Sequence, residues 1–327
     1  MSFAISAADV EDAARVIAPA AIRTPLLENA ALNARCGRRV LVKFEGAQHS
    51  GSFKFRGAYN RLARLDAGER KAGVVAWSSG NHAQGVAFAA RLLGIAATIV
   101  MPADAPAIKT ANTRALGAEV VAYDRFTENR EEIATRLATE RGAVLVPSFD
   151  DPFIMAGQGT IGLEIMEQAA EAGAKIGQIL VNCGGGGMAS GIATTVKARM
   201  PEVNIHAVEP EAFDDTRRSL ASGVRESVSP DARSICDALL SPTPGALTFP
   251  INRALLSGGL AVSDAQVRDA MRFAFSVLKL VVEPGGAASL AAMLAGIAPP
   301  ADGAGVVVLS GSNVDPDSYA RIIGGGA

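Results

Sequence analysis

The chain has 327 residues, of which 49% are hydrophobic and 20% charged, and its 31 Lys and Arg against 33 Asp and Glu give a formal net charge of −2. This composition excludes a disordered chain, a collagen-like repeat and a small disulfide scaffold. Nucleic-acid binding needs a clustered excess of Lys and Arg, so the near-neutral charge argues against such a partner. Because cores tend to split beyond about 250–300 residues, we expect two domains.

The sequence also argues against membrane insertion and secretion. The longest uncharged apolar stretch, 285–301, is interrupted by glycine and ends in Pro-Pro, and the N-terminus lacks the basic and apolar regions of a signal peptide. Cys36, Cys183 and Cys236 are odd in number, widely separated and not spaced as metal ligands. We therefore expect a reduced, cytoplasmic protein without a membrane partner.

Short β-branched runs alternate with alanine-rich helical patterns along most of the chain. The predicted strands are Val40–Phe44, Val74–Trp77, Ala97–Met101, Glu119–Tyr123, Val144–Val146, Gln178–Asn182, Ile205–Val208 and Val306–Leu309. The predicted helices include Phe53–Leu65, Gln84–Leu93, Ala107–Leu116 and Asn129–Thr139, and Ser6 with Asp9 predicts a capping box before them. Apolar strands separated by helices indicate an α/β fold whose parallel sheets are covered on both faces.

Ligands of parallel sheets bind at the carboxyl ends of the strands, so the turns that follow strands are where chemistry is expected. Four turns carry unusual residues, at 51–58 (GSFKFRGA), 78–85 (SSGNHAQG), 183–191 (CGGGGMASG) and 309–315 (LSGSNVD).

The glycine run Gly184, Gly185, Gly186 and Gly187 follows a strand and precedes a helical pattern. Without Cβ atoms, its backbone amides can close around an anion, and the dipole of the next helix favours a phosphate. Two other interpretations stay open from the residues alone. The glycines can serve a flexible or tightly packed turn, or a dinucleotide fingerprint, although no clear acidic ribose ligand follows at the usual spacing.

Lys54 lies at the start of a helical pattern between Phe53 and Phe55. Most lysines are solvated surface charges, but apolar neighbours that desolvate an amine lower its pKa and prepare it for Schiff-base chemistry. Arg56 is predicted to be a structural ion-pair partner.

The turn Ser78, Ser79, Gly80, Asn81 and His82 directly follows a strand. Its small hydroxyls and free N–H groups at a helix start suit a carboxylate, whereas an ordinary helix cap explains one such residue and not the whole run. His82 is as compatible with a structural role as with a functional one.

Together, the four turns resemble those of the fold-type II pyridoxal-phosphate (PLP) enzymes, within which the serine/threonine dehydratases and serine racemases are most similar. The resemblance covers essentially the whole chain, including FDDPFIMAGQGTIGLEI at 149–165 and VVEPGGAASLAA at 281–292. It implies the tryptophan synthase β-like fold, with two doubly wound three-layer α/β/α domains. We expect a large PLP-binding domain at 1–66 and 151–327, a small mobile domain at 74–146, and the active site in the cleft between them.

The resemblance also implies roles for individual residues. Lys54 would form the internal aldimine with PLP, and Phe53 would pack against the ring. The four glycines would hold the phosphate, Asn81 the 3′-oxygen and Ser310 the pyridine nitrogen. Catalysis would use Lys54 and Ser79, which would face each other across the cofactor. The substrate would be bound by Ser78, Ser79, Asn81, His82 and Arg130.

A divalent-cation site is implied as well, with Glu209 and Asp215 as carboxylate ligands and Phe213 as a carbonyl ligand. Such oxygen ligands suit Mg²⁺, or alternatively Ca²⁺ or Mn²⁺. Without the resemblance, this segment can equally be an acidic surface loop.

The sequence departs from the family pattern at three places. Ala238 replaces a common glycine beside the ring and narrows the pocket slightly, and Ser312 replaces a glycine with no expected effect. Twelve residues follow Asp315, so we do not expect a C-terminal regulatory domain.

The implied reaction is β-elimination of water from a β-hydroxy-α-amino acid, which yields a 2-oxo acid and ammonia. L-Serine and L-threonine are placed slightly ahead of 3-hydroxyaspartate, whose second carboxylate needs another cation. Arg125, Arg130 and His49 are the candidates for that cation. A serine or aspartate racemase is the main alternative, an NAD(P)-binding oxidoreductase a remote one, and a non-catalytic amino-acid sensor a third. The family resemblance also implies a homodimer.

Overall fold

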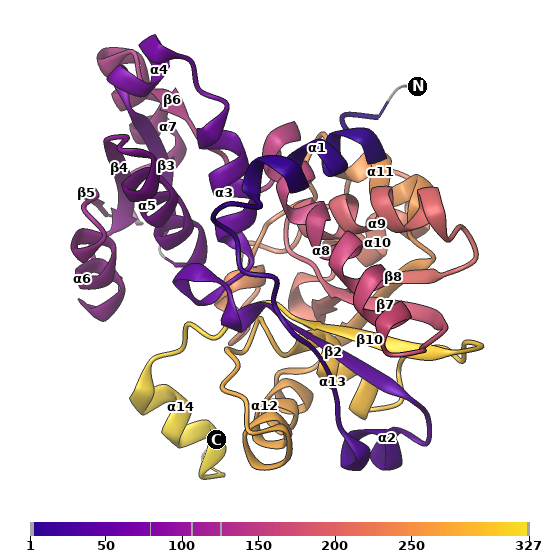
Figure 1. Cartoon of the computed structure of the whole chain (residues 1–327). Coiled ribbons are helices and arrows are strands. Elements are labelled where there is room, and N and C mark those ends of the chain that lie inside the picture. Colours follow the sequence, from indigo (N-terminus) through magenta and orange to yellow (C-terminus); the bar gives the residue numbers. More distant parts are fainter. Residues whose placement is uncertain (1–2, 79, 106, 125, 326–327) are drawn as a thin grey trace.

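Two β-sheets organise the molecule (Figure 1). The structure is a computed structural model and describes residues 3–78, 80–105, 107–124 and 126–325. The strands are β1 (Leu26–Glu28), β2 (Val40–Phe44), β3 (Val74–Trp77), β4 (Ala97–Pro102), β5 (Glu119–Tyr123), β6 (Val144–Leu145), β7 (Ile176–Asn182), β8 (Asn204–Pro210), β9 (Gly258–Val262) and β10 (Ala304–Leu309). The α-helices are α1 (Ala7–Ile17), α2 (Ala30–Cys36), α3 (Lys54–Ala63), α4 (Ala67–Ala72), α5 (Asn81–Leu93), α6 (Ala107–Ala115), α7 (Arg130–Arg141), α8 (Pro152–Glu171), α9 (Gly187–Arg199), α10 (Asp215–Ser222), α11 (Thr248–Leu255), α12 (Asp264–Phe273), α13 (Ala288–Leu294) and α14 (Pro316–Ile323).

The larger sheet has the strand order β1-β2-β10-β7-β8-β9, and all its pairs are parallel except β1 with β2. Its central strands β2, β10, β7 and β8 are buried along almost their whole length. Val307 and Leu309 of β10 belong to one hydrophobic core, whereas Val306 and Val308 belong to the core on the opposite face. This alternation explains why the strand is a continuous apolar run in the sequence.

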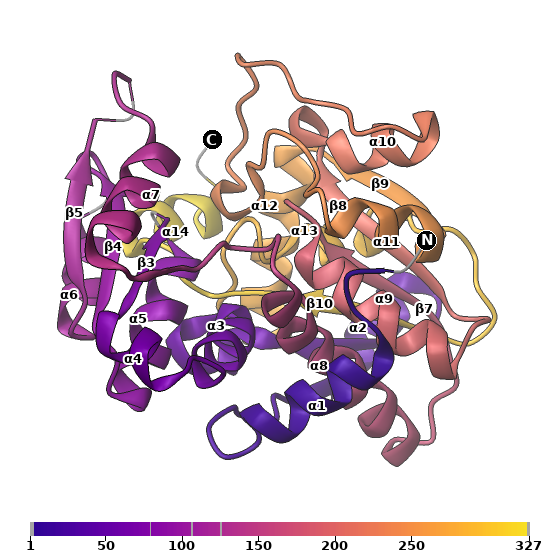
Figure 2. The ribbon, with the colours of Figure 1, turned by 90° about the horizontal axis from the view of Figure 1, so that it is seen from above.

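The smaller sheet, β5-β4-β3-β6, is fully parallel and uses strands from residues 74–145. Helices α3 and α5 pack on one face, where Phe55, Val86 and Ile99 share a core. Helix α7 covers the opposite face through Ala134 and its neighbours. Seen from above, this part of the chain lies beside the larger sheet, with α3 next to α8 between them (Figure 2).

The predicted strands are all present, with small differences in their bounds. The sequence pattern does not predict two further strands: β1 is a partly exposed edge, and β9 begins with two glycines and buries Val262 alone, so neither has the apolar run of a central strand. Helix α5 begins at Asn81, three residues earlier than predicted. The Ser6–Asp9 capping box is confirmed, since the Ser6 amide donates to Asp9 Oδ2 at 2.7 Å and the Asp9 amide to Ser6 Oγ at 3.4 Å.

Cys36, Cys183 and Cys236 are all free thiols. Among the residues that the structure describes, no helix has the length and apolar character needed to cross a bilayer.

Candidate active site

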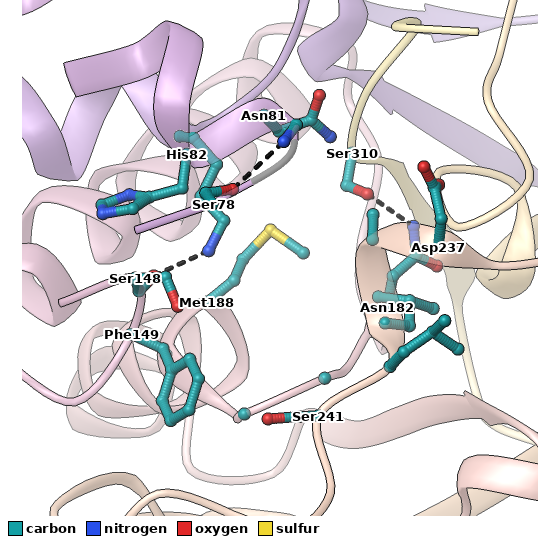
Figure 3. A pocket seen from close by; sticks show the side chains of 18 of the residues that line it. Ser78, Asn81, His82, Ser148, Phe149, Asn182, Met188, Asp237, Ser241 and Ser310 are labelled. Carbon is teal, nitrogen blue, oxygen red and sulfur yellow. Dashed lines mark hydrogen bonds between the residues drawn. The ribbon is translucent and has the colours of Figure 1, made fainter. Parts of the chain in front are cut away.

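A cavity between the two sheets is lined by most of the predicted site residues (Figure 3). These residues are Phe53, Lys54, Ser78, Asn81, His82, Arg130, Gly184, Gly185, Gly186, Gly187 and Ser310. They come from turns at the carboxyl ends of strands and from helix starts, as expected for a parallel α/β protein. The predicted catalytic Ser79 lies outside the described residues, and so does Arg125.

Lys54 begins α3 and directs its amine into the cavity. Its Nζ donates a hydrogen bond to the Ser148 carbonyl oxygen at 2.7 Å and lies 5.2 Å from the centre of the Phe53 ring. Burial of the amine lowers the pKa of Lys54 to about 8, so a substantial share is neutral and nucleophilic near physiological pH. Phe55 is fully buried in the core around α5, so Phe53 is the aromatic neighbour that desolvates the amine.

Arg56, one residue beyond Phe55, anchors α3 through a buried ion network. Its guanidinium donates two hydrogen bonds each to Glu45 and Glu164, at 2.6–2.9 Å. Lys43 Nζ donates to Glu164 Oε2 at 2.6 Å, so two positive charges meet two negative charges. Burial opposes the charge on Arg56, but the two carboxylates outweigh it and raise its pKa. The structural role predicted for Arg56 is therefore confirmed by its contacts.

The turn before α5 brings the first backbone amides of that helix to the cavity. The Gly80 amide donates to Ser78 Oγ at 3.2 Å, and α5 begins at the next residue. The first amides of a helix have no acceptor within the helix and favour an anion. This turn can therefore hold a carboxylate through backbone N–H groups.

His82 contributes differently from the prediction. Burial, together with the charge on Lys54, lowers the pKa of His82 to about 3, so the imidazole is neutral. Its Nε2 lies 2.9 Å from the Val146 carbonyl, which requires the ring proton on Nε2 and leaves buried Nδ1 as an acceptor without a partner among the described residues. The side chain cannot donate to a carboxylate in this state, although its backbone amide can.

Asn81 is held by two residues that the sequence analysis did not single out. Its Nδ2 donates to Glu283 Oε1 at 2.5 Å, and its Oδ1 accepts from Asn313 Nδ2 at 2.7 Å. Glu283 is 2% exposed, and burial raises its pKa to about 8. One Nδ2 hydrogen of Asn81 remains for another acceptor, so its predicted contact with the 3′-oxygen of PLP stays a prediction.

The glycine loop between β7 and α9 has no room for side chains. A Cβ on Gly185 would lie 2.4 Å from the Phe149 ring, and one on Gly186, which has φ +91°, would lie 2.5 Å from Asn252 Nδ2. The Gly185 carbonyl accepts from Thr248 Oγ1 at 2.7 Å. Within the described part of the chain, none of the four glycine amides donates a hydrogen bond. Such a cradle of free amides at a helix N-terminus fits a phosphate.

Ser310, at the carboxyl end of β10, is placed by Asn182. The Asn182 Nδ2 donates to Ser310 Oγ at 3.0 Å, and Asn182 Oδ1 accepts from the Ser289 amide at 2.6 Å. Because Ser310 Oγ already accepts, its own hydrogen is available for an acceptor such as a pyridine nitrogen. Asn182 precedes the glycine run by two positions, and an amide directly after the apolar run 179–181 was the sequence signal for it.

Lys109 was also missed by the sequence analysis. Its Nζ forms an ion pair of 2.8 Å with Asp237 Oδ2, and both residues line the cavity. Arg130 lines it too, is exposed, and has no ion-pair partner among the described residues. His49 is wrong as a candidate for the second substrate carboxylate, since its ring stacks on Phe88 and its Nε2 lies 2.9 Å from the Ala20 carbonyl.

The predicted metal ligands do not line this cavity and extend from the end of β8 (Glu209) through a 3-10 turn (Phe213) to the start of α10 (Asp215). Glu209 accepts hydrogen bonds from the Thr216 and Arg217 amides at 2.9 and 2.8 Å. Burial and the neighbouring Asp215 raise the pKa of Glu209 to about 8, and burial raises that of Asp215 to about 7. Among the described residues, buried Asp215 Oδ2 has no hydrogen-bond partner, which fits a ligand of a cation. No cluster of three or more His, Cys, Asp or Glu side chains that could hold a metal occurs in the ranges the structure describes.

Comparison with known proteins identifies the cofactor that fits this cavity. The family model described as "Pyridoxal-phosphate dependent enzyme" matches residues 17–311. The chain belongs to this family. The members' cofactor accounts for the lysine amine, the phosphate cradle and the hydroxyl of Ser310 facing one cavity, and the residues present fit it. The dinucleotide interpretation of the glycine run is thereby set aside.

Three similar proteins carry three different named activities. The chain is 46% identical over 318 residues to the L-threo-3-hydroxyaspartate ammonia-lyase of Pseudomonas sp, covering 97% of this chain and 98% of the relative. The crystal structure of a T.th. threonine deaminase superposes with a TM-score of 0.90 at 45% identity, covering 95% of this chain and 99% of that one. The structure of maize serine racemase superposes with a TM-score of 0.92 at 37% identity, covering 98% and 97%.

Proposed function

We propose that this protein is a PLP-dependent ammonia-lyase that eliminates water from a β-hydroxy-α-amino acid, with L-threo-3-hydroxyaspartate as its preferred substrate. The observation that carries the proposal is the partly neutral amine of Lys54 facing, in one cavity, a glycine loop with four free amides.

The order of substrates differs from the one based on the sequence. The sequence favours L-serine and L-threonine because their single carboxylate needs the fewest contacts. Two observations support the dicarboxylic substrate instead. One is the 46% identity to a 3-hydroxyaspartate ammonia-lyase along nearly the full length of both chains. The other is the presence of Lys109 and Arg130 in the cavity in addition to Lys54.

When bound, PLP supplies an electron sink for the carbanion that forms at the substrate α-carbon. The protein positions the reactants: the amides at the start of α5 bind the α-carboxylate, and the glycine loop binds the cofactor phosphate. Lys54, whose pKa is close to neutrality, accepts the α-proton at Nζ. Ser310 would offer a hydroxyl rather than a carboxylate to the pyridine nitrogen, and because a hydroxyl is too weak an acid to protonate it, loss of the β-hydroxyl would be favoured over transamination.

The test is turnover by the PLP-loaded protein on L-threo-3-hydroxyaspartate, L-threonine and L-serine. We expect equimolar ammonia and 2-oxo acid, oxaloacetate from hydroxyaspartate, with the highest kcat/KM for that substrate. Lys54→Ala is expected to abolish both turnover and the visible absorbance of lysine-bound cofactor. Lys71→Ala, which removes an exposed lysine at the end of α4, is the matched control. Retention of both properties by Lys54→Ala would refute the proposal.

A racemase remains the second candidate, supported by the TM-score of 0.92 to maize serine racemase. Racemisation needs a proton donor opposite Lys54, a role assigned to Ser79 by resemblance. Chiral chromatography distinguishes the two activities, because racemisation preserves the amino acid as a mixture of enantiomers whereas elimination consumes it. Ser79→Ala is expected to remove racemisation and to leave elimination measurable.

We also propose that Glu209, Asp215 and the Phe213 carbonyl bind a divalent cation, Mg²⁺ first and Ca²⁺ or Mn²⁺ as alternatives. The support is the pair of buried carboxyls with raised pKa values and the unpartnered Asp215 Oδ2. A cation would favour the charged form of both groups and would stabilise the protein.

A homodimer is proposed as the solution state. Its support in the structure is the exposure of Phe275 and Val281, 45% and 43%, on one short segment of the large domain. Light scattering coupled to size exclusion tests it, and a mass of one chain at micromolar concentration would contradict it.

A further inference from the structure

An ion pair joins two sides of the cavity that would hold the substrate. Lys109 comes from α6, beside the small sheet, and Asp237 from the 3-10 turn Asp237–Leu239 of the large domain. Their side chains are unequally exposed: 14% for Lys109 and 54% for Asp237. The lysine amine is therefore almost enclosed, whereas its partner faces water.

The amine of Lys109 lies close to the carboxylate-binding turn. A Cβ built on Gly80 would stand 3.9 Å from Lys109 Nζ. The field of the pair also reaches the interior: although burial is the main influence on the pKa of Glu283, Asp237 raises it further and Lys109 lowers it. Since Glu283 holds Asn81, the pair is electrically coupled to the substrate side of the cavity.

Among the described residues, three cationic side chains line the cavity, and two of them are less suited to bind a second carboxylate. Lys54 is hydrogen-bonded to the Ser148 carbonyl and is needed for the cofactor. Arg130 is exposed, so its guanidinium stays more hydrated than the amine of Lys109. Lys109 is the largely enclosed cation, and it already forms an ion pair with the carboxylate of Asp237. That carboxylate can leave at small cost, because half-exposed Asp237 regains its hydration while the carboxylate of the substrate takes over its contact with Lys109.

We propose that Lys109 binds the side-chain carboxylate of a dicarboxylic β-hydroxy-amino acid, which takes the place of Asp237. A monocarboxylic substrate has nothing to exchange and leaves the ion pair intact. A dicarboxylic one brings a second negative charge that would be costly to bury without a partner. This inference deepens the proposed function and assumes its binding orientation, with the α-carboxylate at the start of α5.

The experiment compares Lys109→Met with wild-type holoenzyme on two substrates. We expect the ratio of kcat/KM for L-threo-3-hydroxyaspartate to that for L-threonine to fall at least 30-fold, mainly through the KM for hydroxyaspartate. Lys109→Arg keeps the charge and should recover most of the ratio. Lys175→Met is the matched control, because it removes a lysine from an exposed ion pair with Asp302, and neither residue lines the cavity. Its ratio should be unchanged.

A binding measurement separates this inference from the proposed function. L-Aspartate and L-alanine lack the hydroxyl leaving group, so their affinities for holoenzyme, read from the cofactor absorbance, do not depend on elimination. Wild type should bind L-aspartate at least 10-fold more tightly than L-alanine, and Lys109→Met should lose that difference. If wild type shows the difference but eliminates water from neither hydroxy-amino acid, the proposed function fails and this inference stands.

Two results would overturn the inference. Equal losses on all substrates in Lys109→Met would assign Lys109 to the shared α-carboxylate or to closure of the cleft. A fall in the substrate ratio in Arg130→Met, with Lys109→Met unchanged, would assign the second carboxylate to Arg130.

Discussion

Replacing Arg56 by methionine tests whether α3, and with it Lys54, depends on the buried ion network. Arg56 and Glu45 are both 0% exposed, and four hydrogen bonds join the guanidinium to Glu45 and Glu164. In the wild type, the two positive charges of Arg56 and Lys43 balance the two carboxylates. The Arg56→Met variant leaves one negative charge uncompensated in the interior.

The expected loss follows from that imbalance. Removing one partner of a buried ion pair costs about 3–5 kcal/mol, a large share of the ~5–15 kcal/mol that stabilises a typical domain. We expect urea unfolding, followed by circular dichroism, to show this loss in Arg56→Met. Adding Glu45→Gln removes the excess negative charge and should recover about 1–3 kcal/mol.

A surface pair provides the control. Arg136 and Glu140 form an ion pair on α7 with side chains 61% and 54% exposed, so Arg136→Met should cost less than about 0.5 kcal/mol. The reasoning is refuted if Arg56→Met loses no more than Arg136→Met, or if Glu45→Gln destabilises the Arg56→Met variant further.

Three further outcomes are expected. Gly186→Ala should weaken PLP binding by about 10-fold or more, since φ +91° is strained for alanine and a Cβ would meet Asn252, whereas Gly173→Ala, with φ +59° and open space, should leave cofactor affinity unchanged in a titration. In chelator, the raised pKa values of Glu209 and Asp215, about 8 and about 7, mean that the folded chain holds protons which the unfolded chain releases. The stability that these bound protons contribute is complete below the unfolded pKa values near 4 and is lost as the pH rises to 8. Mg²⁺ should therefore raise the Tm more at pH 8 than at pH 6. A Glu209→Gln variant whose Tm responds to Mg²⁺ as strongly as the wild type would contradict this. Cofactor loading of apo-protein should accelerate as the pH rises through about 8, the pKa of Lys54, and a rate independent of pH in stopped-flow absorbance would contradict it.

The fold was largely predictable because most strands are buried on both faces. Val40–Phe44, Val74–Trp77 and Glu119–Tyr123 were predicted with the bounds that the structure has. In Val40–Phe44 and Val74–Trp77 the buried run ends where a polar turn begins, whereas Glu119–Tyr123 is partly exposed and was predicted from its β-branched centre. The edge strands β1 and β9 do not share this property, since partial exposure and glycine remove the pattern.

The cofactor side of the site was predictable because consecutive residues of single turns form it. The residues that position those turns were not. Asn182 and Glu283 act on Ser310 and Asn81 from 128 and 202 positions away, and Lys109 meets Asp237 from 128 positions away. One amide, carboxylate or amine in a long sequence carries no local signal of a distant partner. Only folding brings these pairs together, so the resemblance of local motifs did not reveal them.

The position of β10 between β2 and β7 has a consequence for biosynthesis. A ribosome that has released residues 74–145 has delivered every strand of the small sheet, which can assemble at once. The large sheet stays divided in two until residues 304–309 emerge and join the halves by hydrogen bonds. Binding of PLP is therefore expected only near the end of synthesis, because Ser310 directly follows the strand that joins the two halves of the large sheet.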